Sequence, residues 1–439
     1  MNKITTKIIS LLLFLLYISS VQGMEYVKNS YSINGHKPIL RIVNGTDHML
    51  CNRSVSDCYS FSIVNSGTLV SGNMFLDNSF KEIYDFEIHN DSVFFCGTKV
   101  MENGSEISIL GYFDLATFPY STVEVVKMPW IKKIYKLEVA AMGNRTHVVM
   151  VGENLQSNGI VVDAIYYPTY WEVNYTTTEN TTAIFEDVAI TDEYVVATSG
   201  YIGQPEPFYY GRLWYFKKPS TSGASLFPQT AQYINTGYMV MPPFLIDKHR
   251  GDTVVVAARC GAWTIFSNYT MVGVYAGTTP LGDVSLLNES EYSRLTDIRC
   301  HQTDRNLEIA MYNSFPSNLN TTTYTAIYTL TPSMLSYAQA AYGHSYNNVE
   351  ITSVYRAPIY ADHFVATGCG GSPVFHLFAY NYMQYGLCMD EKETTVTPNE
   401  NGETAIKQYV NKTNIKIIPD TCTTSYKDLV MEVKCQHNK

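Results

Sequence analysis

Residues 84–115 read YDFEIHNDSVFFCGTKVMENGSEISILGYFDL: an acidic opening, an apolar strand that ends in Cys-Gly, and then an aromatic strand. The same order returns in residues 185–216 and 244–276. Six copies can be aligned at spacings of 50 to 59 residues, and they begin near Tyr84, Tyr135, Phe185, Phe244, Leu295 and Ile351. Self-similarity at a nearly constant spacing is typical of a fold that repeats one small supersecondary unit.

The repeated runs are short, rich in Val, Ile, Tyr and Phe, and bounded by Gly, Asn, Asp or Pro, which is the pattern of β-strands. No stretch between them keeps the 3.6-residue apolar period of an amphipathic helix. A period near 50 residues, with three visible strands and room for a fourth, is typical of a β-propeller blade. We therefore predict an all-β chain that folds as a single β-propeller over residues 24–439.

Seven blades are expected, with six or eight as the alternatives. Residues 35–82 have the same strand-rich texture as the six copies and are predicted to form one more blade, or most of one. Residues 388–439 are more polar, and we expect them to close the ring by completing the N-terminal blade. Within each blade we expect the apolar strand of the SVFFCG type to lie innermost, because small residues at its end would let the blades converge.

Residues 1–23 predict a signal peptide. Lys3 and Lys7 precede an apolar run at residues 8–18, and small residues follow up to Gly23. This run is too short to span a bilayer, and no later stretch is long and apolar enough to be a transmembrane helix. We expect a mature protein without a membrane span that is secreted or otherwise extracytoplasmic, in the periplasm or at the cell surface.

The composition excludes one class of partner. Hydrophobic residues make up 46% of the chain, which is ample for a core, and the formal net charge is −10. A chain this acidic would be repelled by phosphate backbones, so we expect no nucleic-acid partner.

Nine cysteines occur in a chain that is predicted to be exported, where disulfides can form. An odd number leaves at least one cysteine as a free thiol if the others form disulfides. Proximity in the sequence suggests the pairs Cys51–Cys58 and Cys422–Cys435. Three others each precede a glycine at the end of the same repeated strand, and we expect them to be small buried residues: Cys96, Cys260 and Cys369.

Eleven Asn-X-Ser/Thr sequons occur, against about five expected by chance. The excess fits a glycosylated eukaryotic secreted protein, and it equally fits Asn- and Thr-rich surface loops in a bacterium. The acceptor asparagines are Asn44, Asn52, Asn90, Asn103, Asn144, Asn174, Asn180, Asn268, Asn288, Asn320 and Asn411.

The sequence contains no motif of established chemistry. It lacks an HExxH motif, a CxxC pair, an EF-hand loop, a GxSxG elbow and a Gly-rich phosphate loop. We therefore expect no metal and no cofactor. The lack of a catalytic motif favours a protein that is not an enzyme, without deciding the question.

Aspartates recur near the openings of the repeats, at Asp85, Asp187 and Asp297, with Asp247 less well aligned. Propeller glycosidases use inward carboxylates from several blades. A short acceptor beside a strand start can also satisfy backbone amides. Recurrence at equivalent places favours the structural role, because a catalytic set should break the symmetry of the repeat.

Aromatic clusters are the best candidates for a binding site. They lie beside proline in two expected loops, and aromatic faces on a stiffened backbone are good platforms for sugars or peptides. Packing between blades is the alternative reading. The first cluster is Tyr166, Tyr167, Tyr170 and Trp171, and the second is Phe208, Tyr209 and Tyr210.

Residues 84–115, with DFEIHNDSVFFCGT followed by ILGYFDL, resemble uncharacterised exported β-propeller-like proteins of Bacteroidetes. The resemblance is sharp in this copy and weaker in the other five. It implies the propeller fold and an extracytoplasmic location, and it carries over no catalytic residue. The WD dipeptide, a regular Kelch double glycine and the sialidase Asp-box do not occur.

These observations predict an exported β-propeller that acts as a binding or scaffolding module at or near the cell surface, with a glycan or a protein as its ligand. One alternative is a propeller-type enzyme acting on glycans, a hydrolase or a lyase. A second alternative is a eukaryotic secreted receptor-like glycoprotein. The pattern leaves the oligomeric state open.

Overall fold

The computed structural model describes residues 27–436 with gaps, and it describes side chains in parts of residues 39–300 and 413–424. The predicted signal peptide therefore lies outside the described residues. The segments outside the description are 1–26, 35, 45–46, 54–57, 66–72, 143, 178–183, 203–208, 219–229, 262–268, 281–283, 289–292, 301–306, 315–322, 331–337, 345–349, 357–362, 370–373, 382–388, 395, 400–405, 410, 423, 428–430 and 437–439.

Regular structure in the described residues is β-strand, apart from one 3₁₀ turn at Leu115–Thr117. This confirms the prediction of an all-β chain. None of the described segments forms a helix with the length and apolar content needed to cross a bilayer.

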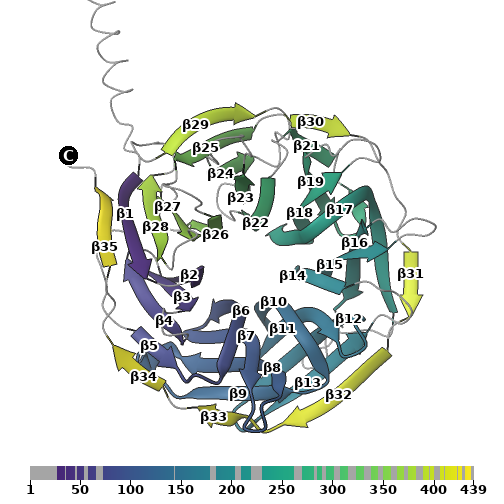
Figure 1. Ribbon diagram of the computed structural model, residues 1–439. Helices are drawn as coiled ribbons and strands as arrows, with labels where there is room; N and C mark the ends of the chain where they lie inside the picture. The colour runs from purple at the N-terminus through teal and green to yellow at the C-terminus, as the bar shows by residue number, and fades with distance from the viewer. Residues whose placement is uncertain are drawn as a thin grey trace, which may run out of the picture.

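The described strands form antiparallel sheets that lie around a common centre (Figure 1). One sheet contains β2 (His36–Asn44), β3 (Asp47–Arg53), β4 (Tyr59–Asn65), β5 (Asn73–Leu76) and β34 (Thr424–Lys427). The next contains β6 (Phe80–His89), β7 (Ser92–Val100), β8 (Glu106–Asp114), β9 (Val123–Met128) and β33 (Asp420–Cys422). A third contains β10 (Ile131–Met142), β11 (Arg145–Asn154), β12 (Gly159–Tyr167), β13 (Tyr170–Thr177) and β32 (Asn411–Ile417).

Two more sheets have the same five-stranded plan. One contains β22 (Ser293–Cys300), β23 (Leu307–Ser314), β24 (Thr323–Leu330), β25 (Ala338–His344) and β29 (Met389–Thr394). The other joins both ends of the chain, with β26 (Glu350–Arg356), β27 (His363–Cys369), β28 (Val374–Asn381), β1 (Val27–Asn34) and β35 (Met431–Gln436).

The remaining sheet has ten strands and consists of two units of the same plan. The first unit is β14 (Ile184–Ile190), β15 (Tyr194–Ile202), β16 (Tyr209–Lys217), the start of β17 (Thr230–Arg250) and β31 (Ile406–Tyr409). The second is the end of β17, β18 (Thr253–Gly261), β19 (Tyr269–Ala276), β20 (Thr279–Pro280), β21 (Val284–Asn288) and β30 (Val396–Asn399).

Strand β17 joins the two units because its pairing partner changes part-way along. Its first part pairs with β16 and β31, and its second part pairs with β18. The register shifts between Met241 and Phe244, where Pro242 and Pro243 stand. Pairing with β18 already begins at Met239, which also faces Tyr210 of β16, so the two prolines lie inside the part of β17 that pairs with β18. Proline has no N–H to donate to a ladder, which accounts for the register shift at these positions.

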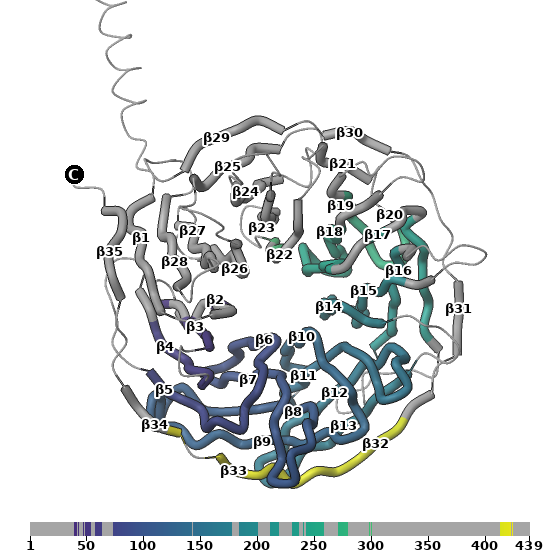
Figure 2. The backbone as a smooth tube through the Cα atoms, viewed as in Figure 1, coloured from purple at the N-terminus to yellow at the C-terminus, as the bar shows by residue number. Residues whose placement is uncertain are grey.

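The C-terminal strands β29 to β35, residues 389–436, form a segment that we call the belt. Each belt strand pairs antiparallel with the outer strand of one four-stranded unit, in reverse chain order: β29 with β25, β30 with β21, β31 with β17, β32 with β13, β33 with β9, β34 with β5 and β35 with β1. Figures 1 and 2 show β32 and β33 along the outside of β13 and β9. Residues 388–439 were expected to complete one blade. Strand β35 does join the sheet of the N-terminal strand, and the rest of the belt joins the other sheets.

The prediction of the innermost strand was wrong. In Figure 1 the strand nearest the centre is β6, which carries Asp85, and the SVFFCG strand β7 is second. Strand β7 is buried along nearly its whole length, whereas β6 is buried only in part. A strand that is covered on both faces has a continuous apolar pattern, so the pattern of β7 reflects packing between neighbouring sheets.

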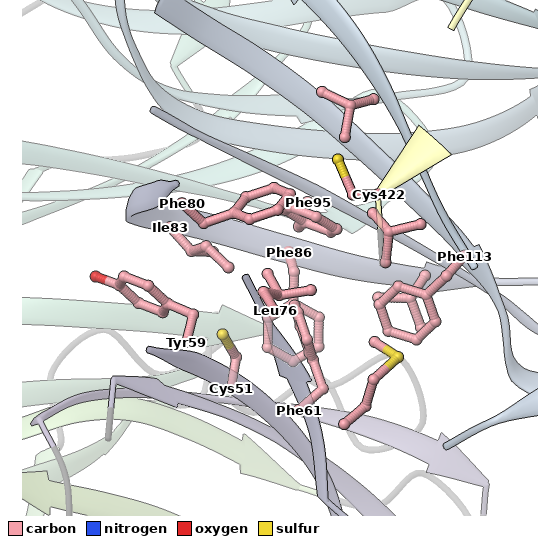
Figure 3. Packing of buried hydrophobic residues seen from close by; sticks show 14 of the residues in the cluster. Cys51, Tyr59, Phe61, Leu76, Phe80, Ile83, Phe86, Phe95, Phe113 and Cys422 are labelled. Atoms are coloured by element: carbon pink, nitrogen blue, oxygen red, sulfur yellow. The ribbon is translucent and has the colours of Figure 1, made fainter. Parts of the chain in front are cut away.

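Apolar side chains fill the spaces between neighbouring sheets. Phe61 of β4 packs with three phenylalanines of the next sheet, at ring-centroid distances of 5.4 Å to Phe86, 5.4 Å to Phe95 and 5.1 Å to Phe113 (Figure 3). Further clusters of the same kind follow around the array. Aromatic rings in such contacts bury a large area and add edge-to-face attraction, so they hold the sheets together.

The cysteines predicted to pair in Cys51–Cys58 are thiols in the structure. Cys51 is fully buried in the aromatic cluster of Figure 3, where burial raises the pKa of its thiol. The Cys58 thiol instead donates to Asn78 Oδ1 (2.7 Å). In the ladder Cys51 lies opposite Phe61, and Tyr59, the neighbour of Cys58, lies opposite Arg53, so the two cysteines do not face each other.

The second predicted pair, Cys422–Cys435, involves two different sheets. Cys422 is a buried thiol on β33, and Cys435 lies on β35, with its side chain outside the described residues. Cys96 is fully buried between sheets, which confirms the expectation of a small core residue. The side chains of Cys260 and Cys369 lie outside the description.

The glycine that follows Cys96 is required because the neighbouring strand leaves no room for a side chain at this position. Strand β6 shifts register between Ile83 and Asp85, and the shift brings the Glu82 carbonyl close to Gly97. A Cβ atom at Gly97 would stand 2.1 Å from that oxygen, and one at Gly152 would stand 2.0 Å from the Lys133 oxygen. The recurrent glycine is therefore required by the bulge in the first strand of these sheets.

We expect Gly97→Ala to destabilise the chain by about 1–3 kcal/mol, because the added methyl group must displace backbone. Chemical denaturation measures the change, with the exposed turn substitution Thr169→Ala as the control. A Gly97→Ala midpoint equal to that of Thr169→Ala would contradict this account of the bulge.

Candidate functional site

The recurrent aspartates bind backbone groups of the neighbouring unit. Asp85 Oδ2 accepts the N–H of Leu137 (3.3 Å) from β10, and Asp187 Oδ2 accepts the N–H of Ile246 (3.0 Å) from β17. Asp247 Oδ2 accepts the N–H of Cys300 (2.6 Å) from β22. Each carboxylate thus links the first strand of one unit to the first strand of the next. The side chain of Asp297 lies outside the described residues.

Asp85 is also part of a buried charged network. Arg41 of β2 donates from Nη2 to Asp85 Oδ1 (2.5 Å) and from Nε to Glu87 Oε1 (2.6 Å). Lys136 Nζ lies 3.9 Å from Asp85 Oδ2. Arg41 and Asp85 are both 2% exposed, so their desolvation must be offset by these several bonds. The network connects β2, β6 and β10 near the centre of the array.

Two adjacent carboxyls on β14 have raised pKa values. Burial raises the pKa of both Glu186 and Asp187 to about 7. Their oxygens accept backbone N–H groups: Phe244 donates to Glu186 Oε2 (2.7 Å), and Val188 donates to Asp187 Oδ1 (2.9 Å). A carboxyl near pKa 7 can serve as a general acid or base. Here the backbone bonds occupy both groups, which supports the structural role that the recurrence of the aspartates favoured.

These pKa values predict a pH dependence of stability. The folded pKa values lie above the unfolded values of about 4, so the folded state binds protons more tightly. This contribution to stability is fully present below pH about 4 and is lost as the pH rises through about 7. The urea midpoint should fall between pH 5 and pH 8, and it should fall less in the Glu186→Gln, Asp187→Asn double variant.

The matched control is Glu193→Gln, an exposed carboxylate in the same sheet, which should keep the slope of the unsubstituted chain. Equal slopes for the double variant and the control would contradict the assignment of the titration to Glu186 and Asp187.

Two residues of the first predicted aromatic site are packed between sheets. Trp171 is fully buried, with ring centroids 5.1 Å from Tyr166, 6.2 Å from Phe94 and 6.3 Å from Tyr112. Burial raises the pKa of Tyr166 to about 12. Trp171 therefore offers no face to a ligand, because packing between sheets takes its whole surface.

Tyr167 and Tyr170 are partly exposed at the hairpin between β12 and β13. Their rings stack at 4.5 Å and 11°. Arg145, on the strand before, lies 3.9 Å from the Tyr167 ring, and Lys416 of the belt lies 5.0 Å from the Tyr170 ring. Each ring thus has one face against the other tyrosine and a cation on its other side. The Tyr167 hydroxyl donates to Glu172 Oε2 (3.2 Å), so the stack offers no open ring face for a sugar to stack on.

The second predicted aromatic site is mostly outside the description. Phe208 lies outside the described residues. Tyr209 and Tyr210 are on β16, opposite Ile202 and Tyr201, and their side chains are not described. The two clusters start on different units of the array.

A pocket that sequence reasoning missed lies where the β7–β8 hairpin, the end of β9 and belt strand β33 meet. Its volume is about 1010 Å³. Most of its lining side chains can donate or accept hydrogen bonds, and no aromatic residue is among those that the structure places around it. The polar lining residues are Asp77, Ser79, Lys99, Glu102, Asn103, Ser105, Lys127, Asp420, Thr421 and Cys422.

Lys99 is the best-connected residue of this pocket. Its Nζ lies 3.0 Å from Cys422 Sγ, 3.4 Å from Asp77 Oδ2 and 4.2 Å from the centroid of the Phe80 ring. Burial acts to raise the pKa of Asp77, but hydrogen bonds from Ser79 and Lys99 hold it below its usual value. At the rim, Lys127 pairs with Asp420 of the belt. The site therefore contains two ammonium–carboxylate pairs, Lys99 with Asp77 and Lys127 with Asp420.

The local sequence contains no signal for this pocket. Lys99 and Cys422 are 323 residues apart. They meet because β33 lies against β9, which no repeat pattern predicts. The Asn103–Gly104 turn is the one local feature that marks a loop at the site.

No protein-family model matches the chain, and no curated protein matches it. The resemblance to exported Bacteroidetes proteins stays a prediction. In the part of the chain that the structure describes, no three His, Cys, Asp or Glu side chains gather in a way that could hold a metal ion.

Proposed function

We propose that the units are the seven blades of one closed β-propeller. Dividing the ten-stranded sheet at β17 gives seven units of one plan, each with four main strands and a belt strand. The pairing of β1 with β28 brings the first described strand into the sheet of β26 to β28, and Figure 1 shows the units around one centre. A propeller of this kind leaves only short, protected edges.

We further propose that the chain is an exported binding module that takes a polyhydroxylated glycan in the pocket beside Lys99. The observation that supports this most is the presence of two ammonium–carboxylate pairs around a volume of about 1010 Å³. Sugar hydroxyls both donate and accept hydrogen bonds, so they match such a lining. Export is proposed from the N-terminal run at residues 8–18.

The inner carboxylates favour binding over hydrolysis. A glycosidase needs two carboxyls on opposite sides of the scissile bond, one free to give a proton and the other free to attack or to activate water. In the described part of the array, Asp85, Asp187 and Asp247 are bound to the backbone of the next unit. Their geometry supports a scaffold.

The test is a glycan array followed by calorimetry on any positive glycan. We expect Lys127→Met and Glu102→Gln each to weaken binding about tenfold, since each removes a charged hydrogen-bonding group from the lining. Melting temperatures should stay within about 2 °C of the unsubstituted chain, because surface substitutions change stability little.

The matched control is Lys217→Met, an exposed lysine on β16 that does not line the pocket. Affinity should be unchanged in this variant. An array without any bound glycan, or equal affinity for Lys127→Met and Lys217→Met, would reject the pocket as the glycan site.

A further inference from the structure

The belt is held to the array mainly through its backbone. Strands β32 and β33 pair with β13 and β9 over the full length of each belt strand. Among the belt residues whose side chains are described, Thr413, Asn414 and Lys416 are exposed, Ile415 and Ile417 are partly buried, and Cys422 alone is buried. A ladder of main-chain hydrogen bonds does not depend on which molecule supplies the strand.

Without the belt, the outer strands of the units would be open sheet edges that could pair with other chains. Strand β9 is largely apolar, with Val123, Val125, Val126 and Met128 buried, and without β33 it would be an open edge. Apolar strands with unpaired N–H and C=O groups pair readily with other chains. Without its belt strand, the outer strand of each other unit would likewise be an open edge.

A few specific contacts set the register of the belt. Asn414 Nδ2 donates to Glu172 Oε1 (2.5 Å) and to Asn174 Oδ1 (2.8 Å). Lys127 pairs with Asp420, and Lys99 Nζ lies 3.0 Å from Cys422 Sγ. These contacts match the belt sequence to its own array, so the best-fitting strand from outside is the belt of an identical chain.

We propose that the outer edges of the seven units form a β-augmentation surface that takes the belt of a second copy of this chain in place of its own. The exchanged assembly contains the same strand pairs and register contacts as the single chain. Exchange of an identical element between copies is a low-cost route to a dimer. Each belt strand is short, so each binds weakly alone, and the joined strands bind tightly through their effective concentration.

The test uses the full chain with a specific protease site placed within residues 382–388, which connect β28 to β29. The folded protein is cleaved, and uniformly ¹⁵N-labelled and unlabelled samples are mixed and followed by native mass spectrometry. We expect the cleaved belt to stay bound at micromolar concentration, and mixed species with one labelled part to approach half of the total. The uncleaved chain, refolded from denaturant at rising concentration, should give a dimer.

Proline substitutions on adjacent residues of β32 supply the matched control. Lys412 and Thr413 have N–H groups that point in opposite directions, one toward β13 and one toward solvent. Proline at the inward position should weaken retention of the cleaved belt about fivefold, and proline at the outward position should leave it unchanged.

Two results would overturn the proposal. In the first, the cleaved belt separates from the array on gel filtration, which would mean that the edges do not hold the strand without the covalent link. In the second, the belt is retained, but no mixed species forms even after joint refolding, and the uncleaved chain stays monomeric.

Discussion

Backbone hydrogen bonding at the sheet edges is the constraint on which this structure depends. Each four-stranded unit has an inner and an outer edge, and unpaired N–H and C=O groups on an edge bind water or another strand. At the periphery one continuous segment, the belt, adds a strand to each unit and pairs with the backbone groups of its outer edge. This arrangement requires contacts between residues hundreds of positions apart, and such non-local contacts carry a high loop-closure entropy.

At the centre of the array, side chains rather than an added strand bind backbone N–H groups of the first strands. The first strands carry Asp85, Asp187 and Asp247, and each accepts a backbone N–H from the first strand of the next unit. A carboxylate is a strong acceptor for such a bond, and burial makes the bond stronger and the ionised group more costly. The pKa near 7 of Asp187 and Glu186 follows from this compromise. Charged groups near the centre of the array thus serve assembly.

Packing between sheets, the second reading that the sequence left open, takes two residues of the first aromatic cluster, Trp171 and Tyr166. Tyr166 precedes and Trp171 follows a proline-containing turn in the pattern of a loop platform, but the chain reverses there within a tight hairpin. Trp171 then points into the core against Phe94. Side chains alternate along a strand, so neighbouring aromatics of one cluster point to opposite faces of the sheet. Which face is the core cannot be read from a strand that is apolar on both sides.

The sequence by itself determined the strand content, the repeated unit and the recurrence of aspartate and glycine at fixed places in it. Those features are local, because β-branched and aromatic runs, turns and bulges are encoded over a few residues. The tertiary structure decided which strand lies at the centre, which aromatics are buried, where the pocket forms and what the polar C-terminal segment does. These depend on the pairing of edges distant in the chain, and an edge strand needs only a backbone to pair, so its sequence need not show its partner.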